Sequence, residues 1–146
     1  MTTALTGKEV ADKLAAQFPE AVLDHNDTSV FVKSDSLVSV CQHLSQAPGL
    51  DFDFLVNLTG VDYMDYFEVV YHLLSMKHNH SVVLKTRCYD RDNPVVPSVT
   101  PVWRAADLME REVFDLVGVR FDGHYNMKRL LLWEGFEGHP LRRDFL

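Results

Sequence analysis

Cysteine is scarce in this sequence of 146 residues, which contains only Cys41 and Cys88. The two stand far apart, so no Cys-x-x-Cys pair is present to hold zinc or an iron–sulfur cluster. Each lies among apolar residues, in the runs VSVCQHL and VLKTRCY, and we therefore expect two buried free thiols rather than a disulfide. This cysteine usage favours a reducing compartment.

Glycine is sparse, and positive charge is not in excess. The seven glycines are isolated and form neither G-x-G-x-x-G nor G-x-x-x-x-G-K-[ST]. No local motif therefore supports binding of a flavin, NAD or a nucleoside triphosphate. The formal net charge of −7 argues against a general nucleic-acid binder, which needs a basic face.

Long hydrophobic runs are also missing. Uninterrupted apolar stretches are only a few residues long, so no segment is predicted to insert directly into a membrane. The first residues, MTTALTGKEVADKL, lack the basic start and apolar core of a signal peptide. Any membrane association is expected to come through a partner chain.

The sequence does contain enough apolar material for one core. Its hydrophobic fraction of 47% is normal for a globular protein, and a domain of this size buries about 68–70% of its unfolded surface. No repeat, low-complexity tract or linker interrupts the chain, so residues 1–146 are predicted to form a single domain. Half of the basic residues, 7 of 14, lie after residue 100.

The first 50 residues carry the signals of two helices and a hairpin. Thr6 is a candidate N-cap, and Glu9 three residues later completes a capping box. Pro19 stops this helix, Pro48-Gly49 ends the next one, and Ser34-Asp35-Ser36 offers N-caps for it. The predicted elements are a helix over residues 7–17, strands over 21–25 and 29–33, and a helix over 37–46.

Three longer strands follow, in the runs DFDFLVNLTGVDY, FEVVYHLLSMK and SVVLKTRCYD. Alternation with period two predicts that Phe52, Phe54, Val56 and Leu58 share one face of the first strand. The short connections between the runs predict an antiparallel meander. A proline-rich loop over residues 92–101 follows the meander.

A third helix is predicted to begin at Pro101, after Thr100 as its N-cap, and to end at Gly118. At 100° per residue its apolar face consists of Val102, Ala105, Ala106, Met109, Val113, Leu116 and Val117. The opposite face is predicted to be a solvated ladder of charges at i, i+4 spacing, formed by Asp107, Arg111 and Asp115.

Glu110 is the unusual residue of this helix, because it projects among apolar and aromatic side chains and so needs a partner or a raised pKa. One interpretation is a buried salt bridge to Arg129 or another arginine. The other is an acid–base couple with His124 or His139. Glu112 points roughly 160° away from Glu110 on a helix, so the two carboxylates cannot act as a pair on one substrate.

The histidines offer weak metal-site candidates. His78-x-His80 could supply two ligands, but it lies on a predicted turn with no third ligand near it in sequence. His124 and His139 each follow a glycine, which favours hydrogen bonding within loops over metal ligation.

The final run, WEGFEGHPLRRDFL, is predicted to be neither helix nor strand. Trp133, Phe136 and Phe145 alternate there with charges and glycines. Aromatic side chains and arginines on an irregular segment are typical of an interface. The alternative is that the run folds back on its own domain.

With these residues in view, the C-terminal third resembles the 30 kDa subunit family of respiratory complex I, also called the C subunit of NADH-quinone oxidoreductase. The segment Gly138–Phe145 is similar to the second hallmark of that family. Tyr125 departs from the pattern, since many relatives carry proline there, and several relatives continue beyond the second hallmark, which implies a shorter partner footprint here. The positions that match the first signature are Glu110, Arg111, Glu112, Asp115, Leu116, Val117, His124, Lys128, Leu130 and Leu131.

The resemblance implies a non-catalytic structural subunit of the hydrophilic arm of an NADH:quinone oxidoreductase, which couples electron transfer from NADH to quinone with proton translocation. FMN, iron–sulfur clusters and quinone would be bound by partner subunits and no cofactor or metal by this chain. It would dock on the 49 kDa, or D-type, subunit on the cytoplasmic side of the membrane.

Two alternatives stay open. Equivalent scaffold subunits occur in membrane-bound energy-converting nickel–iron hydrogenases and in complexes fed by ferredoxin or F420H2, and these motifs do not separate the cases. The other alternative is a stand-alone acid–base enzyme that uses Glu110 and His124.

We therefore predict an α+β fold: a mixed, largely antiparallel sheet flanked by three helices. Residues 110–131 would form the signature helix and loop, and residues 132–146 an extended docking tail. The signature side chains Glu110, Arg111, Glu112 and Asp115 would organise the helix and the tail internally. The residues expected to contact the partner are Arg129, Trp133, His139, Pro140, Leu141, Arg142 and Arg143.

Overall fold

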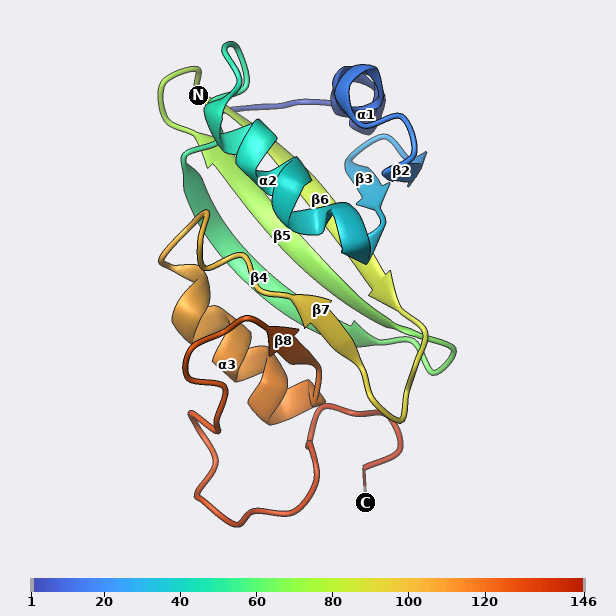
Figure 1. The fold of residues 1–146 in the computed structure, drawn as a ribbon, viewed down its shortest axis with the longest axis vertical. Helices are drawn as coiled ribbons and strands as arrows, with labels where there is room; N and C mark the ends of the chain where they lie inside the picture. The colour runs from blue at the N-terminus through green and yellow to red at the C-terminus, as the bar shows by residue number, and fades with distance from the viewer. Residues whose placement is uncertain (1, 146) are drawn as a thin grey trace.

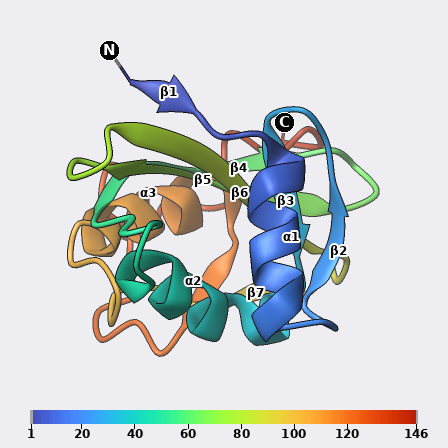
Figure 2. The ribbon, with the colours of Figure 1, turned by 90° about the horizontal axis from the view of Figure 1, so that it is seen from above.

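The protein is described by a computed structural model that covers residues 2–145. Met1 and Leu146, the ends of the predicted domain and tail, lie outside the described residues. One main sheet carries all three α-helices on the same side (Figures 1 and 2). This arrangement confirms the predicted α+β fold.

The main sheet is a mixed one, in the order β2-β3-β6-β5-β4. Strands β4, β5 and β6 form the predicted antiparallel meander, and β3 joins β6 in parallel. A two-residue strand, β1, also pairs with β6. The bounds of the strands are Thr3–Ala4 (β1), Val22–His25 (β2), Ser29–Val32 (β3), Phe54–Asp62 (β4), Phe67–Ser75 (β5) and His80–Cys88 (β6).

The first two helices have the predicted bounds, α1 at Gly7–Gln17 and α2 at Leu37–Gln46. The Thr6 hydroxyl accepts a hydrogen bond from the Glu9 N–H at 3.1 Å, as an N-cap should. Ser36, one of the predicted candidates, is the N-cap residue of α2, but it makes no side-chain capping bond. Residues 34–36 form a short 3₁₀ turn that leads into the helix.

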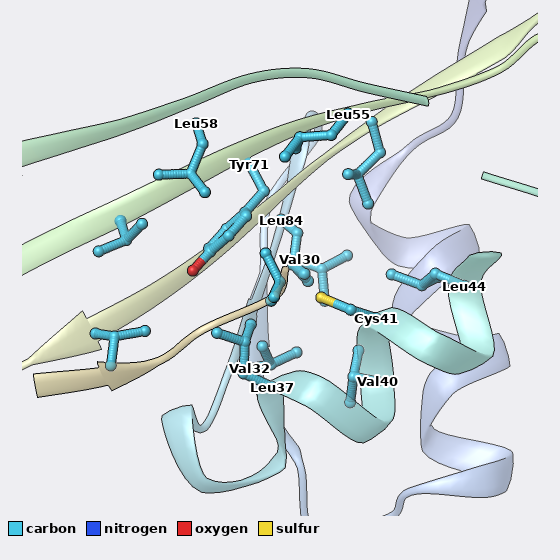
Figure 3. Packing of buried hydrophobic residues seen from close by; sticks show 14 of the residues in the cluster. Val30, Val32, Leu37, Val40, Cys41, Leu44, Leu55, Leu58, Tyr71 and Leu84 are labelled. Carbon is cyan, nitrogen blue, oxygen red and sulfur yellow. The ribbon is translucent and has the colours of Figure 1, made fainter. Parts of the chain in front are cut away.

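The core lies between the sheet and its helices. Figure 3 shows the Tyr71 ring of β5 and the Cys41 sulfur of α2 among aliphatic side chains of both layers. Cys41 is fully buried, as predicted. Cys88 is only partly buried, so the prediction of two buried thiols was wrong for it, because Cys88 ends β6 beside an open loop.

The side-chain alternation predicted for the first long strand was wrong. Phe54 and Val56 are about half exposed, whereas Leu55 and Leu58 are buried. The pairing of β4 with β5 shifts register between Leu55 and Asn57. A bulge of this kind inserts one extra residue and so reverses which side chains face the core.

The third helix, α3, begins later than predicted. It spans Ala106–Val117, and residues 100–105 form turns rather than the first helical residues after Thr100. Its end at Gly118 is as predicted, with φ of 86°. The loop before it holds an unpredicted strand, β7 (Val95–Pro97), which pairs in parallel with β8 (Arg120–Asp122).

Candidate functional site

Residues 123–145 form an irregular segment, called here the C-terminal segment. It follows β8 and passes around the C-terminal end of α3 (Figure 1). It contains neither helix nor strand, as predicted for its last part. Its backbone is therefore held in place by side chains of the domain rather than by its own regular hydrogen bonds.

Asp115 is the centre of this attachment. Its Oδ2 accepts the backbone N–H groups of Leu130, Leu131 and Leu132 at 3.2, 2.7 and 2.9 Å. Its Oδ1 accepts from the Arg129 guanidinium at 2.8 Å. Asp115 is fully buried, so its predicted place on a solvated helix face was wrong. Burial alone would raise the pKa of Asp115, but these bonds hold it below its usual value.

Arg129 is a second organising residue. It pairs with Asp115 and also donates to the carbonyl groups of Phe136 and Gly138 at 2.9 and 2.7 Å. The predicted salt bridge from Arg129 to Glu110 is therefore wrong, because the guanidinium meets the carboxylate of Asp115, further along α3. Arg111 adds bonds to the carbonyl groups of residues 128 and 129.

The last turn of α3 is covered by the same segment. The Leu141 N–H donates to the Leu116 carbonyl at 2.7 Å, and Arg142 Nε donates to the Val117 carbonyl at 2.6 Å. His139 Nδ1 lies 3.0 Å from the Asp115 carbonyl, and burial lowers the pKa of His139. The orphan carbonyl groups at the helix end are satisfied in this way.

Asp62, at the end of β4, is a second anchor that was not predicted from the sequence. It binds the Arg91 guanidinium through both oxygens, at 2.6 and 3.1 Å, and accepts the Arg143 N–H at 2.9 Å. The Arg91 bond, together with backbone bonds, holds the pKa of Asp62 well below its usual value. An aspartate that ends a strand and caps the following turn is the only sequence signal for it.

Glu110 is buried as its position suggested, but its partners are not arginines. One oxygen accepts from Ser98 Oγ at 2.7 Å and the other from the Val99 N–H at 2.8 Å. Burial raises the pKa of Glu110 to about 7, against the effect of these two bonds. Glu110 thus fastens α3 to the end of β7.

The suggested acid–base pair of Glu110 and His124 is not assembled. His124 Nε2 lies 2.9 Å from Asp107 Oδ1 and 3.0 Å from the Asp107 carbonyl, and Glu110 is engaged by Ser98 and Val99. The Tyr125 hydroxyl also donates to Asp107. Lys128 and Glu112 are exposed, so the signature residues do not converge on one pocket.

The partner residues expected from the sequence fall into two groups. Trp133 is 69% exposed and Leu141 58% exposed; the Arg143 side chain is exposed and Pro140 half-buried. The side chains of Arg129, His139 and Arg142 bind the domain itself. Leu141 also borders a groove beside the free edge of β4, together with Gly60, Glu112 and Leu116.

The histidines suggested as weak metal ligands are engaged elsewhere. His78 Nε2 pairs with Asp51 at 2.6 Å and His80 Nε2 with the Leu50 carbonyl at 2.9 Å. Within residues 2–145, no group of three or more His, Cys, Asp or Glu side chains is arranged to hold a metal ion. None of the described helices is long and apolar enough to cross a bilayer.

Comparison with known sequences gives a consistent picture. The model of the family "Respiratory-chain NADH dehydrogenase, 30 Kd subunit" matches residues 30–146. The C subunit of NADH-quinone oxidoreductase from Roseiflexus sp. (strain RS-1) is 43% identical over 97% of this chain and 84% of its own. The corresponding protein from Acidithiobacillus ferrooxidans (strain ATCC 53993 / BNL-5-31) is 42% identical over 99% of this chain and 77% of its own.

A solved structure extends the comparison to the fold. A chain in the structure of the membrane-bound sulfane sulfur reductase, an archaeal respiratory membrane complex, superposes with a TM-score of 0.76 and 26% identity. The match covers 95% of this chain and 85% of that one. Almost the whole fold, and not only the signature region, is therefore shared.

Proposed function

Since the chain belongs to the family of the 30 kDa subunit of the respiratory-chain NADH dehydrogenase, we propose that it is a structural, non-catalytic subunit of a complex I-like NADH:quinone oxidoreductase. In this role it belongs to the hydrophilic arm of a membrane-bound respiratory complex, on the cytoplasmic side. Electron transfer and the coupled proton translocation take place in neighbouring subunits, which bind FMN, iron–sulfur clusters and quinone.

One observation supports this role most directly: the C-terminal segment is held in place by the domain, yet it carries large apolar side chains exposed among charged ones. Asp115 and Asp62 hold its backbone, whereas Leu131, Trp133 and Leu141 are each more than half exposed. Large apolar side chains that remain exposed on a preformed surface are typical of a protein interface. Preformation also lowers the ordering cost of binding.

The proposed partner is the 49 kDa, or D-type, subunit. In this proposal Trp133, Pro140, Leu141 and the Arg143 side chain contact it. Arg129, His139 and Arg142 act indirectly, because their side chains are engaged in bonds to α3 and to the segment itself. The expected contact residues thus divide into those that touch the partner and those that hold the segment in place.

Co-purification tests the proposal. The double variant Trp133→Ala with Leu141→Ala should recover the large subunit at least about tenfold less well, as expected when two interface anchors are lost. Leu23→Ala with Met76→Ala is a matched control, because these side chains lie in β2 and directly after β5 and are 57% and 68% exposed. Equal recovery of the large subunit with both folded variants would rule out docking through this surface.

The second candidate is the equivalent scaffold subunit of another membrane-bound complex, either an energy-converting nickel–iron hydrogenase or a complex fed by ferredoxin or F420H2. The similarity to a chain of the sulfane sulfur reductase, a respiratory membrane complex, supports a role outside an NADH-linked complex. The lower identity of that match, 26% against 43% for the relative from Roseiflexus, favours the NADH-linked complex. Mass spectrometry of the intact purified complex decides between them. A flavin subunit that binds NADH supports the first role. A large subunit with nickel-binding Cys-x-x-Cys motifs, or an electron-input subunit for ferredoxin or F420H2, supports the second.

A further inference from the structure

Glu110 remains unexplained by docking, since it lies inside the domain. It is fully buried, and within residues 2–145 it forms no ion pair with a lysine or arginine. Its bonds come from one hydroxyl group, on Ser98, and one backbone N–H, on Val99. A carboxylate buried with so little compensation for its charge binds a proton more readily than an exposed one.

The titratable groups around Glu110 come from every layer packed against it. Cys41 of α2 and Tyr71 of β5 are buried, and burial, with a contribution from Glu110, raises the pKa of each. Asp107 of the same helix raises the pKa of Glu110, and His124 of the C-terminal segment lowers it. His124 is itself paired with Asp107, so none of these described neighbours supplies a fixed positive charge.

A chain of hydroxyl groups connects this carboxyl group to the edge of the molecule. Ser98 Oγ lies 2.7 Å from Glu110 Oε1 and 2.9 Å from Thr100 Oγ1, and either hydroxyl of the second pair can donate. Thr100 is partly exposed. When Glu110 is ionised, Ser98 donates to it. When Glu110 is protonated, the direction reverses, so that Glu110 donates to Ser98 and Ser98 donates to Thr100.

We propose that Glu110 is a proton-binding site of the folded chain, reached from the surface through the hydroxyl groups of Thr100 and Ser98. Its protonation removes the cost of burying a charge between α3 and the layer formed by β7 and β8, which outweighs the weaker bonds that Ser98 and Val99 make to the neutral carboxyl group. The same helix holds the C-terminal segment through Asp115. The stability of the helix to which that segment is attached therefore depends on pH. The inference does not depend on which partner the segment binds.

The expected pH dependence follows from the direction of the shift. The folded pKa of Glu110, about 7, lies above its reference value of 4.5. The folded state therefore keeps a proton that the unfolded state has lost, and the extra stability is complete below pH 4.5 and is lost as the pH rises toward 7. Within that window this group alone raises the unfolding equilibrium constant about tenfold per pH unit.

Carbon-13 NMR of glutamate carboxyl groups in the full chain tests the site directly. One glutamate signal should titrate with a midpoint near 7 and should be absent in Glu110→Gln. Glu112→Gln, on the exposed face of the same helix, should leave that signal unchanged. If every glutamate carboxyl titrates below pH 5.5 in the folded wild type, the proposal is wrong.

Two further variants test the hydroxyl chain. Ser98→Ala removes the donor to the ionised carboxylate and should raise the midpoint of Glu110. Thr100→Val removes a hydroxyl group that pairs with Ser98 in both protonation states, so it should move the midpoint less than Ser98→Ala does, and Thr100→Ser should restore the wild-type midpoint. No shift in Ser98→Ala, or a larger shift in Thr100→Val than in Ser98→Ala, would contradict this chain of hydroxyl groups.

Discussion

At the scale of single residues, local hydrogen bonding decides the role of each acidic group. Periodicity placed Asp115 opposite the apolar face of α3, but it could not show that residues 129–132 would cover that face. Glu110 was expected to need a partner and does have one. The partner was misidentified because a serine hydroxyl and a backbone N–H leave no charge pattern in the sequence.

Removal of the Asp115 carboxylate should be strongly destabilising. Asp115→Ala leaves the Arg129 guanidinium and three backbone N–H groups without their acceptor, a loss of about 3–5 kcal/mol in the free energy of unfolding. Urea denaturation measures it. Glu112→Ala, exposed on the same helix, should change stability by less than about 0.5 kcal/mol. Similar values for the two variants would contradict this role of Asp115.

Among the helices and strands, the sequence predicts correctly those whose bounds are set by residues close together in the chain. Helices α1 and α2 have the predicted bounds because an N-cap, prolines and apolar spacing all act within a few residues. Strands β7 and β8 were not predicted, because each has only three residues and is defined by its pairing with the other, which lies far away in the sequence. The bulge in β4 was missed for a similar reason, since it is defined relative to β5.

The end of α3 provides a prediction at this scale. Gly118 has φ of 86°, and a Cβ there would lie 2.5 Å from Arg142 Nη2 and 2.6 Å from His139 Cδ2. Gly49 has the same φ, with no atom within 4 Å of such a Cβ. Both alanine variants should lose about 1–2 kcal/mol from left-handed backbone strain, and Gly118→Ala should lose about 1–3 kcal/mol more from the clash.

Thermal or chemical unfolding of the two glycine variants measures the difference. A larger loss in Gly118→Ala would show that the C-terminal segment packs against the helix end in the isolated chain. Equal losses would mean that the segment is displaced from the helix end at little cost.

At the scale of the whole molecule, the C-terminal segment is joined to the sheet through Asp62 and to α3 through Asp115. The two anchors lie in different layers, so the segment ties the sheet and the helix together at one end of the domain. Family membership was recognisable from residues 110–145 because the signature lies in one continuous stretch. The Asp62 anchor was not, since its partners Arg91 and Arg143 are distant in sequence.

Acid should weaken the whole molecule through these two anchors. The folded pKa of each aspartate is lowered from a reference value of 3.8. Their stabilising contribution is therefore present above pH 3.8 and is lost as the pH falls through the folded pKa. Urea denaturation between pH 2 and pH 5 should show this decline, and Asp62→Asn with Asp115→Asn should flatten it. An unchanged slope in the double variant would assign acid sensitivity to other groups.

The bond between the Asp62 carboxylate and the Arg143 N–H joins residues 81 positions apart in sequence. Contacts across such long loops carry a large entropic cost early in folding. The segment should therefore close after the sheet has formed. Asp62→Asn, which weakens this bond together with the bonds from Arg91, should accelerate unfolding while leaving the folding rate nearly unchanged, with a φ-value near zero. The chain would then pass through a brief state in which the sheet and helices are native and the C-terminal segment is not yet attached.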